Sequence, residues 1–192
     1  MKTFLRVVLV GFIVVFFAEL SFADEYNFRK TKWGMSIAQV KSSEPLNVAE
    51  ESTTLLAYKT TVIGKDVFVT YFFIDNQLVR ATYLLTRSHT NKNDFITDYN
   101  DFKKILTTKY GKPKANESLW KNDLYKDDYS DWGFAISLGH LIYISSWETP
   151  DTEVNNMLMG ENYDITCAVE YSSKNLKELE KKDQEKKALD AF

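Results

Sequence analysis

Hydrophobic residues alternate with polar ones in three short runs in the first half of the chain, and tight turns separate these runs. Gly64-Lys65 and Asp75-Asn76 are residue pairs typical of such turns. The middle run is apolar at both odd and even positions, which predicts a central strand covered on both faces, or a strand with one face open to a partner. The predicted strands are 54–63, 66–74 and 77–85.

A second group of alternating runs lies in the other half of the chain. Turn residues such as Gly139-His140 and Pro150-Asp151 separate its members, which predicts a second antiparallel meander. The polar segments 46–53 and 114–129 are predicted to be loops. The predicted strands of the second group are 131–138, 140–148, 152–159 and 163–171.

Helical periodicity precedes each group of strands. Ser36 and Gln39 form the capping-box pattern of a short helix at 36–43. A longer helix is predicted at 93–110, where apolar residues recur at helical spacing. Asn93 could cap its start, and Gly111 suits a left-handed C-cap.

These elements predict an α+β fold, a largely antiparallel meander sheet with helices on one face. We expect one domain over residues 24–173, with tandem helix-plus-meander units at 33–85 and 93–171. A charged C-terminal helix, capped by Ser173, should cover residues 174–192.

The N-terminus has the three zones of a secretory signal peptide. Lys2 and Arg6 precede an apolar run over 7–18, and Ser21-Phe22-Ala23 forms a cleavage site before Asp24. An uncleaved anchor is the alternative, although the run is short of the roughly 20 residues that span a bilayer. We therefore expect cleavage between Ala23 and Asp24, after a signal peptide at residues 1–23, and a periplasmic or secreted protein.

Net charge limits the classes of partner, and the cysteine content bears on thiol chemistry. The chain carries 24 basic and 27 acidic residues, and this mild acidity argues against nucleic acid and anionic lipid as partners. The sequence holds no second apolar segment long enough for stable membrane insertion after cleavage. Cys167 is the only cysteine and alternates with Ile165 and Val169, which favours a buried side chain over a reactive thiol.

The sequence carries no recognisable catalytic or metal-binding motif. His89 and His140 lack a partner at the spacing that places two ligands on one helical face, so we expect no metal and no cofactor. The acidic stretch 123–131 is interpreted as a solvated loop, with a weak calcium site as the alternative. Asp127, Asp131 or His140 would serve a hydrolase if the chain were an enzyme.

Strand aromatics are the remaining candidate for a binding surface. Tyr58, Tyr71, Tyr83 and Tyr143 all fall in predicted strands, and exposed aromatic residues often mark protein interfaces. The alternative is that these side chains belong to the core.

Two motifs resemble those of small exported bacterial proteins of uncharacterised function. The motifs are Trp33-Gly-Met-Ser-Ile-Ala-Gln-Val-Lys41 at a helix start and Lys109-Tyr-Gly-Lys-Pro113 at a helix end. The layout is also similar to the repeat of the β-lactamase inhibitory protein, and to the small lipoprotein of the outer-membrane assembly machinery. This resemblance implies a binding protein rather than an enzyme, and it assigns no functional residue here.

We therefore expect an exported, soluble, non-catalytic binding module that contacts another envelope or secreted protein through its sheet face. A small-ligand or envelope-stress module, or a hydrolase using the 123–131 carboxylates, are the alternatives. The sequence leaves the partner and the oligomeric state open.

Overall fold

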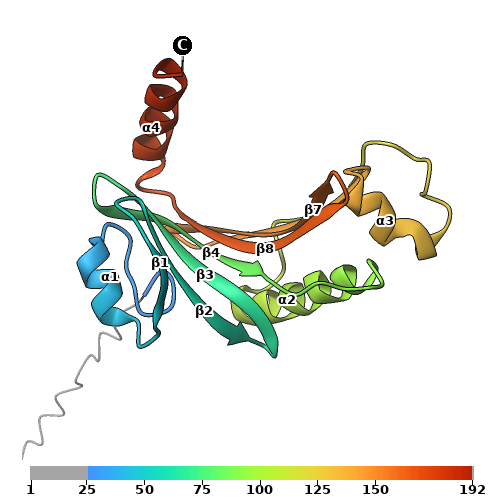
Figure 1. Ribbon diagram of the computed structural model, residues 1–192, viewed down its shortest axis with the longest axis horizontal. Helices are drawn as coiled ribbons and strands as arrows, with labels where there is room; N and C mark the ends of the chain where they lie inside the picture. The colour runs from blue at the N-terminus through green and yellow to red at the C-terminus, as the bar shows by residue number, and fades with distance from the viewer. Residues whose placement is uncertain (1–25, 192) are drawn as a thin grey trace, which may run out of the picture.

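The computed structural model describes residues 26–191. The predicted signal peptide and its cleavage point between Ala23 and Asp24 lie outside the described residues. Within them, one eight-stranded antiparallel sheet has the order β1-β2-β3-β4-β8-β7-β6-β5 (Figure 1). The strands are β1 (Val48–Glu51), β2 (Leu55–Val62), β3 (Lys65–Ile74), β4 (Gln77–Leu85), β5 (Ala115–Trp120), β6 (Leu141–Glu148), β7 (Thr152–Glu161) and β8 (Asp164–Ser173).

The sheet consists of two four-stranded meanders joined along one seam. Each meander pairs consecutive strands, and β4 pairs with β8 in antiparallel fashion, with Tyr83 opposite Val169. Each meander also follows a helix in the chain. The predicted α+β class, with its two tandem helix-plus-meander units, is therefore confirmed.

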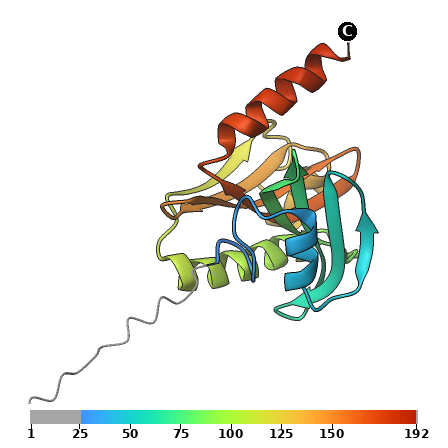
Figure 2. The same ribbon diagram turned by 90° about the vertical axis from the view of Figure 1, so that its left-hand side faces the viewer.

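The helices divide between the two sides of the sheet. Figures 1 and 2 show α1 and α2 on one side and α4 rising from the other. None of the helices in residues 26–191 combines the length and apolar content needed to cross a bilayer. The helices are α1 (Ile37–Ser43), α2 (Asp94–Tyr110), α3 (Trp132–Ser137) and α4 (Lys177–Leu189), with a short 3-10 turn, η1 (Tyr129–Asp131), before α3.

The predicted helix signals act as expected in α1 and in part at the end of α2. Ser36 and Gln39 form a complete capping box at α1. Gly111 ends α2 with φ of 81°, which glycine adopts without strain, but its ψ of −162° lies outside the predicted left-handed C-cap conformation. Asn93 makes no capping bond: its side chain instead bonds Gly133 and the 129–130 backbone, and thereby joins α2 to α3.

Three predicted segments are corrected by the structure. The presumed loops at 46–53 and 114–129 contain the edge strands β1 and β5, whose side chains are mostly exposed and therefore show no burial pattern. The presumed strand 131–138 is helix α3. Its Gly133 lies so close to α2 that a Cβ would stand 2.3 Å from the Lys92 carbonyl carbon.

The C-terminal helix begins later than predicted. It starts at Lys177 rather than at 174, although the Ser173 hydroxyl does accept a hydrogen bond from the Leu176 N–H at 3.2 Å.

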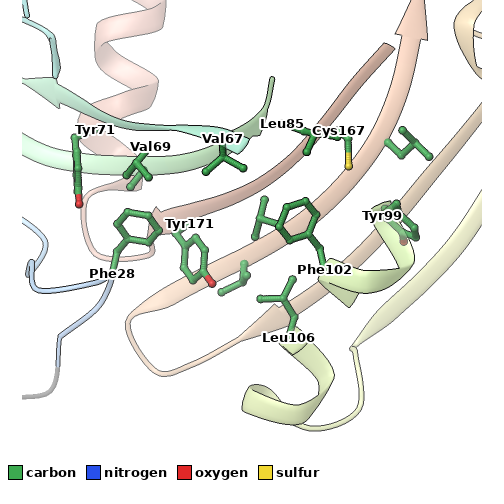
Figure 3. Packing of buried hydrophobic residues seen from close by; sticks show 14 of the residues in the cluster. Phe28, Val67, Val69, Tyr71, Leu85, Tyr99, Phe102, Leu106, Cys167 and Tyr171 are labelled. Carbon is green, nitrogen blue, oxygen red and sulfur yellow. The ribbon is translucent and has the colours of Figure 1, made fainter. Parts of the chain in front are cut away.

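The core lies between the sheet and the helices α1 and α2, and Figure 3 shows its centre. Phe28, in the segment before α1, inserts among three tyrosines. Its ring centroid lies 5.5 Å from that of Tyr71, 4.9 Å from Tyr83 and 4.8 Å from Tyr171. The segment before α1 thus closes the core between the two meanders.

Candidate binding face

All four predicted binding tyrosines lie on the sheet face that the helices cover. Tyr58 and Tyr71 are fully buried, while Tyr83 and Tyr143 are half-buried and packed against the core. The pairing of Tyr58 with Val69, and of Val69 with Tyr83, places these side chains on one face. The interpretation of these tyrosines as a partner surface is therefore replaced by the alternative, a role in the core.

Polar groups inside the fold explain why tyrosine suits the covered face. The Tyr71 hydroxyl donates a hydrogen bond to the buried Glu44 carboxylate, which also accepts two bonds from Arg29 at 2.7 and 3.0 Å. Burial and this carboxylate raise the pKa of Tyr71 above its ordinary value. Burial also raises the pKa of Tyr58, and that of Tyr143, to about 12. These phenols stay neutral and serve packing.

Helix α2 covers the same face at the second meander. The Tyr99 hydroxyl of α2 lies 2.6 Å from the Ser145 hydroxyl of β6. The side-chain amide of Asn156, on β7, donates to the Tyr99 carbonyl at 3.0 Å. The helix thus supplies hydrogen-bond partners to buried polar strand residues, although Asn156 Oδ1 has no partner among the described residues, and this face is therefore the inner one.

The opposite sheet face, here called the open face, carries an apolar row that runs across the strands. Cross-strand neighbours share a face, so successive pairs trace the row from β5 to β2. Acidic and basic residues stand at its two ends. The row is Glu117, Ile144, Met157, Ala168, Leu84, Phe68 and Lys59.

The members of the row are accessible to different degrees. Leu84, at the centre of the sheet, is 37% exposed. Phe68, Ile144 and Met157 are half-buried, and Ala168, between Met157 and Leu84, is buried. The row is therefore a solvent-facing apolar strip rather than a second core.

Side chains on one side of the row extend its apolar area, and side chains on the other side are polar. Leu119 pairs with Ile142, and a shallow hollow lined by Ile142 and Met159 lies next to them. On the other side of the row, Arg80 lies over the Phe72 ring at 4.8 Å. The open face thus has an apolar centre and a polar margin, the usual anatomy of a protein interface.

Helix α4 borders the polar margin of the open face. Lys177 contacts Glu153 of β7 at 3.1 Å, and Glu180 lies 3.6 Å from Arg80 of β4. No residue of α4 is buried. The helix therefore stands beside the open face and leaves the apolar row uncovered (Figure 1).

The candidate catalytic residues do not form a site. His140 stacks on Tyr125, with ring centroids 5.9 Å apart, and its Nδ1 is buried without a hydrogen-bond partner among the described residues. Asp127 is exposed, and Asp131 precedes α3 without making a capping bond. Among residues 26–191, no three His, Cys, Asp or Glu side chains converge as metal ligands would.

His89 takes part in a buried charge cluster that the sequence did not reveal. Its Nε2 lies 2.6 Å from one oxygen of Asp98, and Lys65 Nζ lies 2.5 Å from the other. Lys65 also reaches Asp101 at 2.8 Å. The cluster joins the start of β3, in the first meander, to α2. Its role is therefore structural.

Cys167 lies in the core, as its alternation with Ile165 and Val169 predicted. The thiol is free and buried. Burial raises its pKa to about 12, so the reactive thiolate form is suppressed.

Comparisons of the chain with known protein families, with curated proteins and with solved structures give no match. Function is therefore inferred from the open face itself. The sequence did contain its signal, because the even positions of the β3 run, Phe68 and Phe72, are as apolar as the odd ones.

Proposed function

We propose that the protein is an exported, non-catalytic binding module that holds a partner protein on the open face of its sheet. The observation that carries this proposal is the apolar row from Ile144 to Phe68, which crosses the seam between the two meanders. A contiguous apolar strip with charged ends is the surface expected of a protein interface.

The shape and charge of the open face favour a protein over the other partner classes. Small molecules are bound in enclosed pockets, whereas this strip is broad and shallow. Anionic lipid is not favoured, because the border of the strip has no excess of basic groups: its carboxylates at Glu148, Glu153 and Glu170 are paired with Lys114, Lys177 and Arg80. A protein with an apolar ridge and a mixed-charge margin fits both properties.

Site-specific photo-crosslinking in the cells that produce the protein tests this proposal. A photoreactive amino acid replaces Leu84 at the centre of the row. In the matched control it replaces Ile105, an exposed apolar residue (49%) on α2, on the other side of the sheet. Crosslinks to another polypeptide are expected from position 84 and not from position 105.

A charge substitution provides the second arm. Leu84→Glu places a carboxylate in the centre of the row and should abolish the crosslinks formed from Met157, two strands away in the row, while Ile105→Glu should leave them unchanged. Both variants must retain the circular dichroism spectrum of the wild type. Equal crosslinking from positions 84 and 105, or crosslinks that survive Leu84→Glu, would contradict the proposal.

A further inference from the structure

The two edge strands of the sheet differ in how well they are protected against pairing with another strand. β1 is four residues long, contains two glutamates and has a register shift between Val48 and Glu50. Shortness, charge and bulges are the usual means by which proteins block an edge. β5 is less protected: it is six residues long, carries a single glutamate, contains no proline and pairs with β6 without a register shift.

The backbone groups that β5 leaves unpaired can be assigned from its pairing with β6. The Lys121 N–H donates to the His140 carbonyl at 2.7 Å, so residue 121 and every second residue before it face β6. Because antiparallel ladders alternate, the N–H and C=O groups of Asn116, Ser118 and Trp120 point away from the sheet. In the described part of the chain, no turn or loop backbone bonds to them.

Helix contact with β5 is confined to its end, where the Trp120 ring lies 5.6 Å from the Trp132 ring of α3. Helix α3 packs against β6, β7 and β8, and α2 packs against the same three strands. Asn116 to Leu119 are all exposed. An incoming strand can therefore reach the outward groups of β5.

The sequence of β5 is complementary to itself in one antiparallel register. With Leu119 opposite its own copy, Ser118 and Trp120 exchange backbone hydrogen bonds across the two-fold axis. Glu117 then faces Lys121 of the other copy twice, and Leu119, 46% exposed in the single chain, is covered. A register centred on residue 117 sets glutamate against glutamate, and one centred on Ser118 sets Glu117 against leucine.

We propose that β5 pairs antiparallel with β5 of a second copy of this chain, centred on Leu119, so that two eight-stranded sheets become one continuous sheet. The contact is small for a stable interface, so the dimer forms reversibly with rising concentration. This proposal does not rest on the function proposed above, because the central residues of the apolar row are not part of the contact.

A disulfide test reads the register directly. Residues opposite each other in a non-hydrogen-bonded antiparallel pair lie about 4.5 Å apart at Cα, within reach of a disulfide. The native Cys167 is the only cysteine in the sequence and is buried. Leu119→Cys should therefore give a covalent dimer under mild oxidation, whereas Glu117→Cys, which lies opposite residue 121, should give at least about tenfold less.

Sedimentation velocity over a concentration series tests the edge itself. Ser118→Pro removes an outward N–H without breaking the β5–β6 ladder, because proline is tolerated on the free side of an edge strand. It should raise the dimer dissociation constant at least about tenfold. Glu117→Lys or Lys121→Glu alone should also weaken the dimer, and the double variant should restore it.

The outcomes separate the alternatives. A wild type that stays monomeric at every concentration, together with a Leu119→Cys variant that forms no covalent dimer, overturns the proposal. So does a dimer that ignores both Ser118→Pro and the charge reversals, because it would use another surface. If Ser118→Pro fails to fold, the paired reversals still decide the question. A monomeric variant that still crosslinks a partner through position 84 would leave the proposed function intact.

Discussion

Lys65 Nζ lies 2.5 Å from Asp98 Oδ1, and each of these side chains is less than one-tenth exposed. Residues 33 positions apart are thereby joined, one at the start of β3 and the other on α2. His89 occupies the second oxygen of Asp98. The carboxylate of Asp98 is thus the shared acceptor that attaches the second unit's helix to the first unit's meander.

Asp98→Asn should destabilise the fold by about 3 kcal/mol, because it leaves the buried Lys65 ammonium without its nearest counter-charge. Asp101→Asn is the matched control. Its carboxylate binds the same ammonium at 2.8 Å, but the side chain is half-exposed, and its loss should cost less than about 1 kcal/mol. Urea unfolding at pH 7 measures both. Equal effects of the two substitutions would show that burial of the Asp98 pair does not matter.

Acid should remove the contribution of Asp98. Burial alone would raise its pKa, but hydrogen bonds from Lys65 and His89 outweigh burial and hold the pKa below its ordinary value of 3.8. Because the folded pKa is the lower one, the stabilisation is complete above the unfolded pKa and is lost as the pH falls through the folded pKa. The difference in unfolding free energy between wild type and Asp98→Asn should therefore shrink as the pH falls below the ordinary carboxyl pKa of 3.8. A difference that stays constant or widens over that range contradicts this assignment.

Loss of the hydroxyl should lower the unfolding free energy at Tyr71 but not at the neighbouring Tyr58. Tyr71→Phe removes a hydrogen bond to the buried Glu44 carboxylate, which should cost about 1.5–3 kcal/mol. The Tyr58 hydroxyl is buried with no partner among the described residues, so Tyr58→Phe should be neutral or slightly stabilising. Thermal and urea unfolding of both variants compare the two sites directly. A larger loss for Tyr58→Phe would mean that its hydroxyl is satisfied in solution.

Local sequence patterns were sufficient to predict the elements in which buried and exposed side chains alternate regularly. The strands from β2 to β4 alternate between two environments and end in turn residues, and α2 repeats its apolar residues with helical spacing. β5 could not be found in this way. Its side chains are mostly exposed and its stability comes from backbone bonds to β6, so burial imposes no period on its sequence.

Local sequence patterns also do not show which face of the sheet the helices cover. The odd and even positions of β3 are both apolar, so the sequence does not say which set the helices cover. Strand aromatics often mark protein interfaces when they are exposed, but Glu44 and Arg29 supply buried partners for the Tyr71 and Tyr83 hydroxyls. Glu44 lies 27 residues from Tyr71 in the chain. A contact of that kind follows from the pairing of distant elements, which a single sequence does not specify.

Helix α4 should be dispensable for the stability of the sheet. None of its residues is buried, and its side chains reach the strands through ion pairs such as Lys177–Glu153 and Arg80–Glu180. Surface ion pairs contribute little, so a chain ending at Asn175 should lose less than about 1 kcal/mol of unfolding free energy. Its far-UV circular dichroism should lose only the signal of one 13-residue helix.

The same truncation separates two interpretations of α4. If α4 only borders the open face, crosslinking from position 84 should persist in the shortened chain, because the apolar row from Ile144 to Phe68 is unchanged. If α4 instead holds part of the partner, crosslinking should fall while the stability remains as before. A loss of more than about 3 kcal/mol would contradict both, since breaking exposed ion pairs cannot account for it. Such a loss would place α4 within the cooperative fold.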